Sequence, residues 1–169
     1  MAKKTDQFAN KFFGTVVEGS ANTLTFNEIP TNVDVFSKKA WVLHALEWYP
    51  GVASLNALDA ADDVIQAALV SSQAISALSL GDPGVIDLLE IEANVATAVG
   101  FAVSILPIRR DFTSMPGGGL IISPRPLYLA VKGISLGGAL TVSCRGYFTA
   151  IDLNADEYLE LVDFYRIVQ

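Results

Sequence analysis

The amino-acid sequence predicts an all-β fold that ends in a single α-helix. In several segments hydrophobic residues recur at every second position, which is typical of strands with one buried face. Glycine and proline cluster between those segments, as they do in turns. A clear helical spacing of hydrophobic residues is found near the C-terminus. About eight short strands followed by one helix indicate a two-sheet sandwich or a small barrel.

The strands are expected in a regular series along the chain. The first lies within residues 1–20, and the others are expected at 22–28, 40–49, 64–73, 99–106, 126–133 and 139–150. The last is the clearest, since apolar and polar side chains alternate along it. Its apolar face comprises Leu140, Val142, Cys144 and Phe148. Segments 40–49 and 64–73 are apolar on both faces, so we expect them to be central or covered strands. Residues 84–94 fit either a helix or a strand.

The closing helix is expected at residues 154–166. Asn154 can cap its N-terminus, and Glu157 follows three positions later, as in a capping box. The helix then has an apolar stripe of Tyr158, Leu161, Val162 and Tyr165. With 169 residues, the chain is expected to be one domain. It divides into an N-terminal arm with the first strand (1–20), a sandwich (21–153) and the helix (154–169).

Three consecutive glycines, in the stretch MPGGG at 115–119, raise the question of a phosphate-binding loop. Such a loop runs from a strand into a helix, with Lys and Ser or Thr directly after the last glycine. Here Gly119 is followed by LIIS and then by a predicted strand that contains Lys132. The stretch is therefore interpreted as a turn that leads into strands.

Composition points to a protein that is partly covered by other protein. Hydrophobic residues make up 51% of the chain and charged residues only 17%, against a usual charged fraction of about a quarter. The net charge is −7, and the basic residues near the N-terminus are Lys3, Lys4 and Lys11. We therefore expect weak or indirect contact with nucleic acid. The sequence also predicts no membrane span, since its longest apolar run is too short.

The sequence offers few residues for catalysis. His44 is its one histidine, which excludes a zinc finger and any metal site built from several histidines. Cys144 is its one cysteine, so no internal disulfide can form. No G-x-S-x-G motif accompanies His44, which is interpreted as a strand residue with a satisfied hydrogen bond. We predict no enzyme activity, no catalytic or metal-binding residue and no cofactor.

Two groups of acidic residues are candidates for a catalytic or calcium site. They are Asp59, Asp62 and Asp63 in the first group and Asp82, Asp87, Glu90 and Glu92 in the second. Paired carboxylates can hydrolyse glycosides, and such clusters can bind calcium between subunits. The regular calcium-loop spacing is missing, however. An acidic loop more often caps backbone groups or is solvated.

Six residues are predicted to lie at an interface with another subunit: Arg109, Arg110, Asp111, Arg125, Tyr158 and Tyr165. The arginines can form forked hydrogen bonds with a neighbour's carboxylate. The alternative is a solvated strand end with weak surface ion pairs. Trp41, Trp48 and Tyr49 are candidates for a sugar-stacking platform, or else for the core and the edge of the sandwich.

The C-terminal third of the chain resembles a known family. The segments PLYLAVKG, LTVSCRGYFTA and LNADEYLELVDFYR are similar to the last strands and the closing helix of single jelly-roll capsid proteins from small icosahedral viruses. The resemblance implies a jelly-roll β-sandwich of about eight antiparallel strands that tiles a closed shell, with no catalytic residues to carry over. Many such proteins begin with a strongly basic arm, which this sequence lacks.

The expected function is therefore that of a structural capsid subunit. Many copies, alone or with a second capsid protein, would assemble into an icosahedral virion inside the host cell. Shell assembly needs rigid surfaces and no reactive group, in agreement with the composition. Three alternatives stay open at this point: a carbohydrate-binding sandwich module, a trimeric jelly-roll binding protein, and a glycoside hydrolase that uses Asp62, Asp63 or Glu90.

Overall fold

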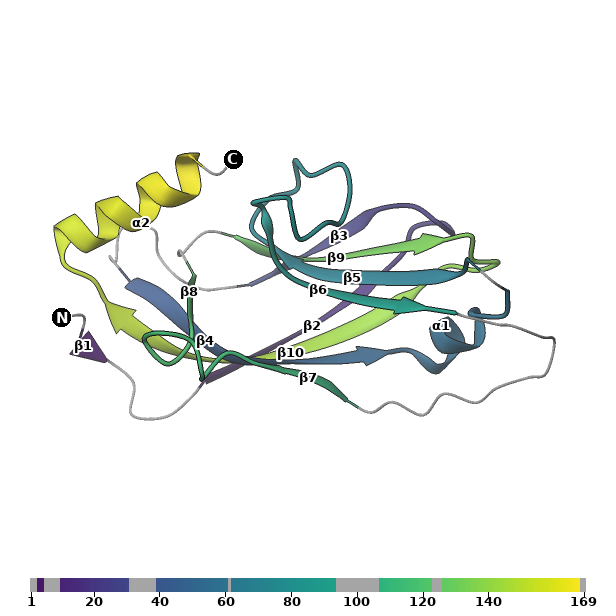
Figure 1. Ribbon diagram of the computed structural model, residues 1–169, viewed down its shortest axis with the longest axis horizontal. Coiled ribbons are helices and arrows are strands. Elements are labelled where there is room, and N and C mark those ends of the chain that lie inside the picture. The colour runs from purple at the N-terminus through teal and green to yellow at the C-terminus, as the bar shows by residue number, and fades with distance from the viewer. Residues whose placement is uncertain are drawn as a thin grey trace.

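A computed structural model of the chain describes residues 3–4, 10–30, 39–60, 62–93, 107–122 and 126–167. Two antiparallel sheets lie one above the other, with α2 and β1 near one end of the molecule and α1 near the other (Figure 1). The elements in order are β1 (Lys3–Lys4), β2 (Asn10–Val17), β3 (Thr25–Ile29), β4 (Lys39–Pro50), α1 (Val52–Asn56), β5 (Val64–Val70), β6 (Val85–Glu92), β7 (Ile108–Asp111), β8 (Leu120–Ile122), β9 (Leu127–Ile134), β10 (Thr141–Asp152) and α2 (Ala155–Ile167).

The strand order is that of a jelly roll. In the six-stranded sheet the order is β1-β10-β4-β7, with β2 also paired to β10 and β8 also paired to β4. The second sheet has the order β3-β9-β5-β6. The pairs are nested along the chain, because β2 pairs with β10, β3 with β9, β4 with β7 and β8, and β5 with β6. The chain is thus one long hairpin rolled into a sandwich, which confirms the predicted fold class.

The core lies between the two sheets. Trp48, Leu43 and Leu46 of β4 are fully buried there, as are Leu129 and Val131 of β9. At one end of the core, Trp41 stacks on Phe148 with ring centroids 3.9 Å apart and on Phe12 at 6.0 Å. Gly146 makes room for this cluster, since a Cβ there would lie 2.2 Å from the Phe12 ring. The apolar face predicted for 139–150 skips position 146, and packing explains this, because the Phe12 ring occupies the space that a side chain at Gly146 would need.

Both central strands are also covered on their outer faces, as the apolar character of 40–49 and 64–73 predicted. Over the second sheet, Ile75 and Leu78 of the β5–β6 connection pack on Ala68, Val70 and Ala130, and this connection curls over the sheet in Figure 1. Over the six-stranded sheet, Leu161 of α2 packs against Ala40, Val42 and Ile151.

The predicted capping box of α2 is confirmed. The Asn154 backbone N donates to Glu157 Oε2 at 3.0 Å, and the Glu157 backbone N donates to Asn154 Oδ1 at 2.9 Å. These reciprocal bonds satisfy two backbone donors at the start of the helix. Of the predicted apolar stripe, Tyr158 and Leu161 are half-buried, and the side chains of Val162 and Tyr165 lie outside the described part.

The β2–β3 turn is joined to the β9–β10 turn through Glu18 and Asn22. The buried Glu18 carboxylate accepts hydrogen bonds from the backbone N–H groups of Thr23 at 3.0 Å, Gly133 at 2.6 Å and Leu140 at 3.0 Å. Asn22 pairs with the Leu136 backbone in both directions, at 2.9 and 3.0 Å. One end of the sandwich is therefore closed by side-chain bonds to backbone groups.

The structure resolves the ambiguous segment and adds an element. Residues 84–94 contain the strand β6, and the short helix α1 lies between β4 and β5, where the sequence predicted no helix. The glycine stretch at 115–119 is a turn that leads into β8, as predicted, with Gly117 and Gly118 at positive φ. The strand predicted at 99–106 lies outside the described residues.

Candidate functional site

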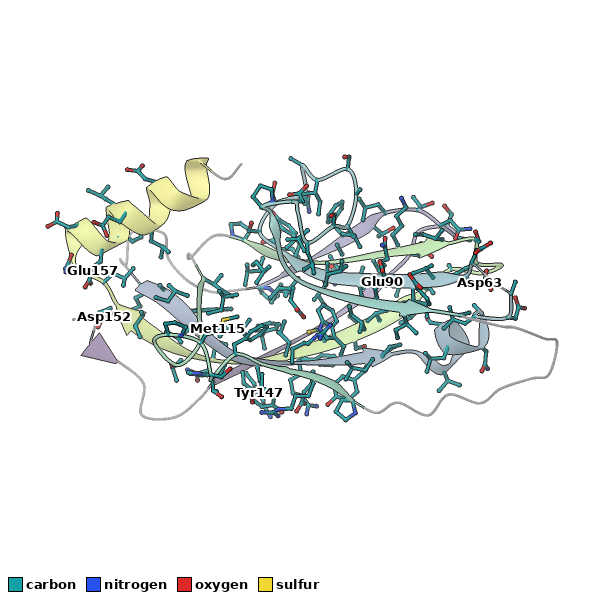
Figure 2. The ribbon with its side chains drawn as sticks, viewed as in Figure 1. Asp63, Glu90, Met115, Tyr147, Asp152 and Glu157 are labelled. Carbon is teal, nitrogen blue, oxygen red and sulfur yellow. The ribbon has the colours of Figure 1, made fainter. Side chains whose placement is uncertain are left out.

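The outer face of the six-stranded sheet carries polar and aromatic side chains in regular rows. Val142 and Cys144 point into the core, so the odd-numbered residues of β10 point away from it. In the first row, Phe13 of β2 lies opposite Arg145, Arg145 opposite Glu47 of β4, and Glu47 opposite Arg109 of β7. A neighbouring row consists of Lys11, Tyr147, Ala45 and Asp111. Figure 2 shows Tyr147 on the side away from the second sheet.

These two rows, together with Tyr49, are called the cross-strand surface below. Glu47 lies at its centre and is 8% exposed. Glu47 Oε2 accepts hydrogen bonds from Tyr49 at 2.9 Å and from Tyr147 at 3.1 Å, and Oε1 accepts one from Arg109 Nη1 at 2.8 Å. Arg145 Nη1 lies 3.8 Å from Oε2. One carboxylate thus holds side chains from three strands in place.

The hydrogen bonds keep Glu47 ionised at neutral pH. Burial of the carboxyl raises its pKa, but the bonds from Tyr49, Tyr147 and Arg109 outweigh that effect and leave the pKa below its ordinary value. In turn, the hydrogen bond to Glu47 and partial burial raise the pKa of Tyr49. The hydroxyl of Tyr49 therefore remains a donor at neutral pH.

Both arginines of the cross-strand surface are stacked on tyrosines. The guanidinium carbon of Arg109 lies 5.7 Å from the centroid of the Tyr147 ring, and that of Arg145 lies 5.7 Å from the Tyr49 ring. The arginine side chains remain 52% and 41% exposed. Stacked arginine and tyrosine side chains, held in place before binding, are typical of the energetic centres of protein interfaces.

Of the predicted interface residues, Arg109 and Asp111 belong to this surface. The carboxylate partners of Arg109 lie in its own chain, at 2.8 Å in Glu47 and 3.7 Å in Asp111, whereas the sequence suggested a neighbour's carboxylate. Asp111 also accepts hydrogen bonds from the side chain and backbone N–H of Thr113, which lower its pKa. Arg109 and Asp111 therefore form a network of contacts within one chain, and their side chains remain accessible to solvent.

The other predicted interface residues lie elsewhere. Arg110 reaches across one edge of the sandwich, where Nη2 donates to the Leu88 carbonyl oxygen at 3.4 Å and Nε lies 4.0 Å from Asp87 Oδ1. Tyr158 lies on α2 and is half-buried. Arg125 and the Tyr165 side chain lie outside the described part of the chain. The structure therefore brings together two of the six predicted residues.

Comparison with protein-family models and with curated proteins found no match for this sequence. Function must therefore be argued from the fold and from the chemistry of the described residues. Among these residues, no helix has the length and apolar character required to cross a bilayer.

The acidic groups do not form a shared site in the described part of the chain. Asp63 is 1% exposed and accepts backbone hydrogen bonds from Asp59 at 2.9 Å and Ala60 at 2.7 Å, so it holds its own loop. Glu90 instead accepts a hydrogen bond from Gln66 at 2.6 Å on an exposed part of β6. Figure 2 shows Asp63 beyond Glu90, towards the end of the sandwich. No group of three or more potential metal ligands occurs among the described residues.

The tryptophans do not form an exposed platform. Trp48 is fully buried, and its Nε1 donates to Asp87 Oδ2 at 2.9 Å, which joins the two sheets inside the core. Trp41 is 5% exposed within its aromatic stack. Tyr49 alone of the three is on the cross-strand surface. The core interpretation of Trp41 and Trp48 is therefore confirmed, which leaves the half-buried Tyr49 as the one residue still open to solvent among the three proposed for sugar stacking.

His44 is a strand residue with both ring nitrogens hydrogen-bonded, as predicted. Nδ1 lies 2.9 Å from the Gly118 carbonyl oxygen, and Nε2 lies 3.0 Å from Thr149 Oγ1. His44 is the extra residue where the pairing of β4 with β10 shifts, because Leu43 faces Phe148 and Ala45 faces Tyr147. Its role in the structure is to anchor the glycine turn to the sheet.

Sequence reasoning missed Glu47, the central residue of the cross-strand surface. Glu47 lies in the apolar segment 40–49, and no alternating pattern of charged residues along this segment marks it as part of a polar face. Arg145 and Tyr147 lie on the face of β10 opposite Val142 and Cys144, in agreement with the alternation that predicted this strand. Their alignment with Glu47 depends on the register between β4 and β10, and neither segment contains that information by itself.

Proposed function

We propose that this protein is a structural capsid subunit, many copies of which assemble into a closed icosahedral shell. The observation that carries the proposal is the jelly-roll strand order, the fold expected from the family that the C-terminal third resembles. A fold alone does not imply a function. The cross-strand surface therefore supplies the second part of the argument, because its chemistry is suited to protein contacts.

Several exposed apolar side chains also favour association between copies. Large examples are Phe13 and Val17 on β2, Val52 on α1, Leu80 in the β5–β6 connection and Leu159 on α2, each at least 56% exposed. Single exposed apolar residues are ordinary on proteins. In a chain with only 17% charged residues, however, few charged side chains are present to surround them. A closed symmetric shell repeats each contact many times, so that individually modest interfaces are sufficient.

The proposed partners follow from the same features. The main partner is the protein itself, with or without a second capsid protein, and the proposed location is the virion, assembled inside the host cell. A net charge of −7 makes strong sequence-independent binding of nucleic acid unfavourable. Packaged genome would therefore be contacted weakly, or through another protein.

The experiment is to measure the mass of the purified recombinant protein by size-exclusion chromatography with light scattering, and to image any large species by negative-stain electron microscopy. We expect regular closed particles of uniform size. A stable trimer would instead support the jelly-roll binding protein. A monomer at every protein concentration and ionic strength tested would contradict self-assembly.

A further inference from the structure

We propose that the cross-strand surface of one subunit binds the exposed face of α2 in a second copy of this chain. The inference rests on the proposed self-assembly and names the contact that would carry it. It is a head-to-tail contact, because one copy contributes the sheet and the other the helix. Contacts of this kind continue from subunit to subunit until the rotation closes.

On the sheet side, the contact would be centred on Phe13 and Arg145. They are cross-strand neighbours, and Phe13 is 60% exposed on β2. Lys11 lies two positions before Phe13 and is also exposed. The guanidinium of Arg145 makes a long contact of 3.8 Å to Glu47, and its planar group has further N–H donors to offer. An apolar centre is thus flanked by cationic groups.

On the helix side, the exposed residues of α2 have the complementary arrangement. Asp156, Leu159, Glu160 and Asp163 are all exposed, and their spacing places them on one face of the helix. Leu159 is 58% exposed between these carboxylates. The opposite side of α2 is used within the subunit, where Leu161 packs against Ala40 and Val42. The acidic face is therefore available to another molecule.

The helix's own stability does not account for all of this acidic face. A carboxylate in the first turn of a helix is stabilised by the helix dipole, which explains Asp156. Glu160 and Asp163 lie beyond the first turn, where that effect has decayed. Placed against Lys11 and Arg145 of another copy, they would pair with opposite charges around a Leu159–Phe13 contact.

The two faces also agree in size. The stripe from Asp156 to Asp163 extends about 10 Å along the helix, at 1.5 Å per residue. The row from Phe13 to Arg109 crosses four neighbouring strands, which corresponds to about 14 Å. Docking would also offset part of the like-charge repulsion between copies of a protein with a net charge of −7, because the acidic helix would face the cationic part of its neighbour.

The test uses two full-length variants, Phe13→Asp and Leu159→Asp, with Leu80→Asp as the matched control. Leu80 is 71% exposed but lies in the β5–β6 connection, which packs over the second sheet and belongs to neither proposed face. Circular dichroism and thermal melting would verify that each variant folds. We expect each contact variant to raise the subunit concentration needed for assembly by about tenfold or more, and the control to assemble as the wild type does.

Mixing the two variants tests whether the sheet face of one copy binds the helix face of another. Phe13→Asp retains a functional helix face and Leu159→Asp retains a functional sheet face, so the mixture should form a one-to-one dimer and no larger species. As a second pair, Arg145→Glu and Glu160→Arg should each impair assembly, and the double variant should restore it. This pair decides the question should an aspartate variant fail to fold.

The outcomes separate the inference from the proposed function. Wild-type particles together with unimpaired assembly of both contact variants would overturn the inference and leave the capsid proposal intact. Impaired variants that fail to form the mixed dimer would also overturn it. A wild-type protein that never assembles would overturn both.

Discussion

Glu47 of β4 and Arg109 of β7 are direct cross-strand neighbours, and Arg109 Nη1 donates to Glu47 Oε1 at 2.8 Å. The same carboxylate accepts from Tyr147 on β10, so three strands are connected through one side chain. Because the arginine is half-exposed while the carboxylate is buried, the network is anchored inside and open to solvent outside. Because these side chains are already held in place by hydrogen bonds, they would lose little side-chain entropy on forming a contact with another molecule.

Replacement of this carboxylate should cost stability in a pH-dependent way. Glu47→Gln removes the negative charge that the two tyrosines and Arg109 stabilise, and we expect a loss of about 1–2 kcal/mol in the free energy of unfolding at neutral pH. Because the pKa of Glu47 is lowered in the folded protein, its contribution is fully present above the pKa of the unfolded chain. It is lost as the pH falls through the folded-state pKa.

Urea denaturation of the wild type and of Glu47→Gln between pH 3 and pH 7 would test this. The two stability curves should be furthest apart near neutrality and converge in acid. Glu28→Gln, at an exposed position of β3, is the control and should follow the wild type at every pH. A difference that does not change with pH would show that the charge of Glu47 is not the source of its effect.

Glu18 should be the most sensitive polar residue of the β2–β3 turn. Glu18→Ala leaves the backbone N–H groups of Thr23, Gly133 and Leu140 without their acceptor. Two of these donors, Gly133 and Leu140, are buried, and each buried donor left unpaired costs about 1–3 kcal/mol, so we expect a loss of at least about 2 kcal/mol. Denaturant unfolding with Glu28→Ala as the exposed control would measure it. A variant that unfolds at the wild-type urea concentration would disprove the role of Glu18.

The sequence predicted most of the fold because the fold depends on local patterns. Alternation identified β9 and β10, and the apolar character of both faces identified β4 and β5 as covered strands. The segment 84–94 was ambiguous for a physical reason. Leu88 of β6 packs under the β5–β6 connection while Leu89 packs in the core, so both faces are apolar and the period of two is hidden.

The candidate surface was less predictable because it is non-local. Arg109 and Asp111 were identified from their charges at a strand end. The approach of Arg145 to Glu47 depends on the pairing of β4 with β10, and that pairing includes the shift at His44. A single inserted residue of this kind moves later side chains to the other face. The local sequence patterns of β4 and β10 do not indicate this register shift.

The last glycine of the 115–119 turn should tolerate no side chain. A Cβ at Gly119 would lie 2.6 Å from the Leu43 carbonyl oxygen and 2.6 Å from Val42 Cγ1. We expect Gly119→Ala to lower the free energy of unfolding by about 1–3 kcal/mol, because the backbone must move to relieve the overlap. Gly137→Ala is the control, since no atom lies within 4 Å of its Cβ position. Equal thermal melting of both variants would contradict the close packing of this turn on β4.

Cys144 should react with thiol reagents only when the protein unfolds. Its side chain is fully buried in the core, and burial, followed by the negative charges of Asp87 and Glu47, raises the pKa of the thiol. Deprotonation therefore favours the unfolded state, and stability should decline as the pH rises above the ordinary cysteine value of 9.0. An aromatic disulfide reagent at pH 8 should label the native protein slowly, at a rate that increases with urea. Fast labelling without denaturant would show that this part of the core opens in the native state.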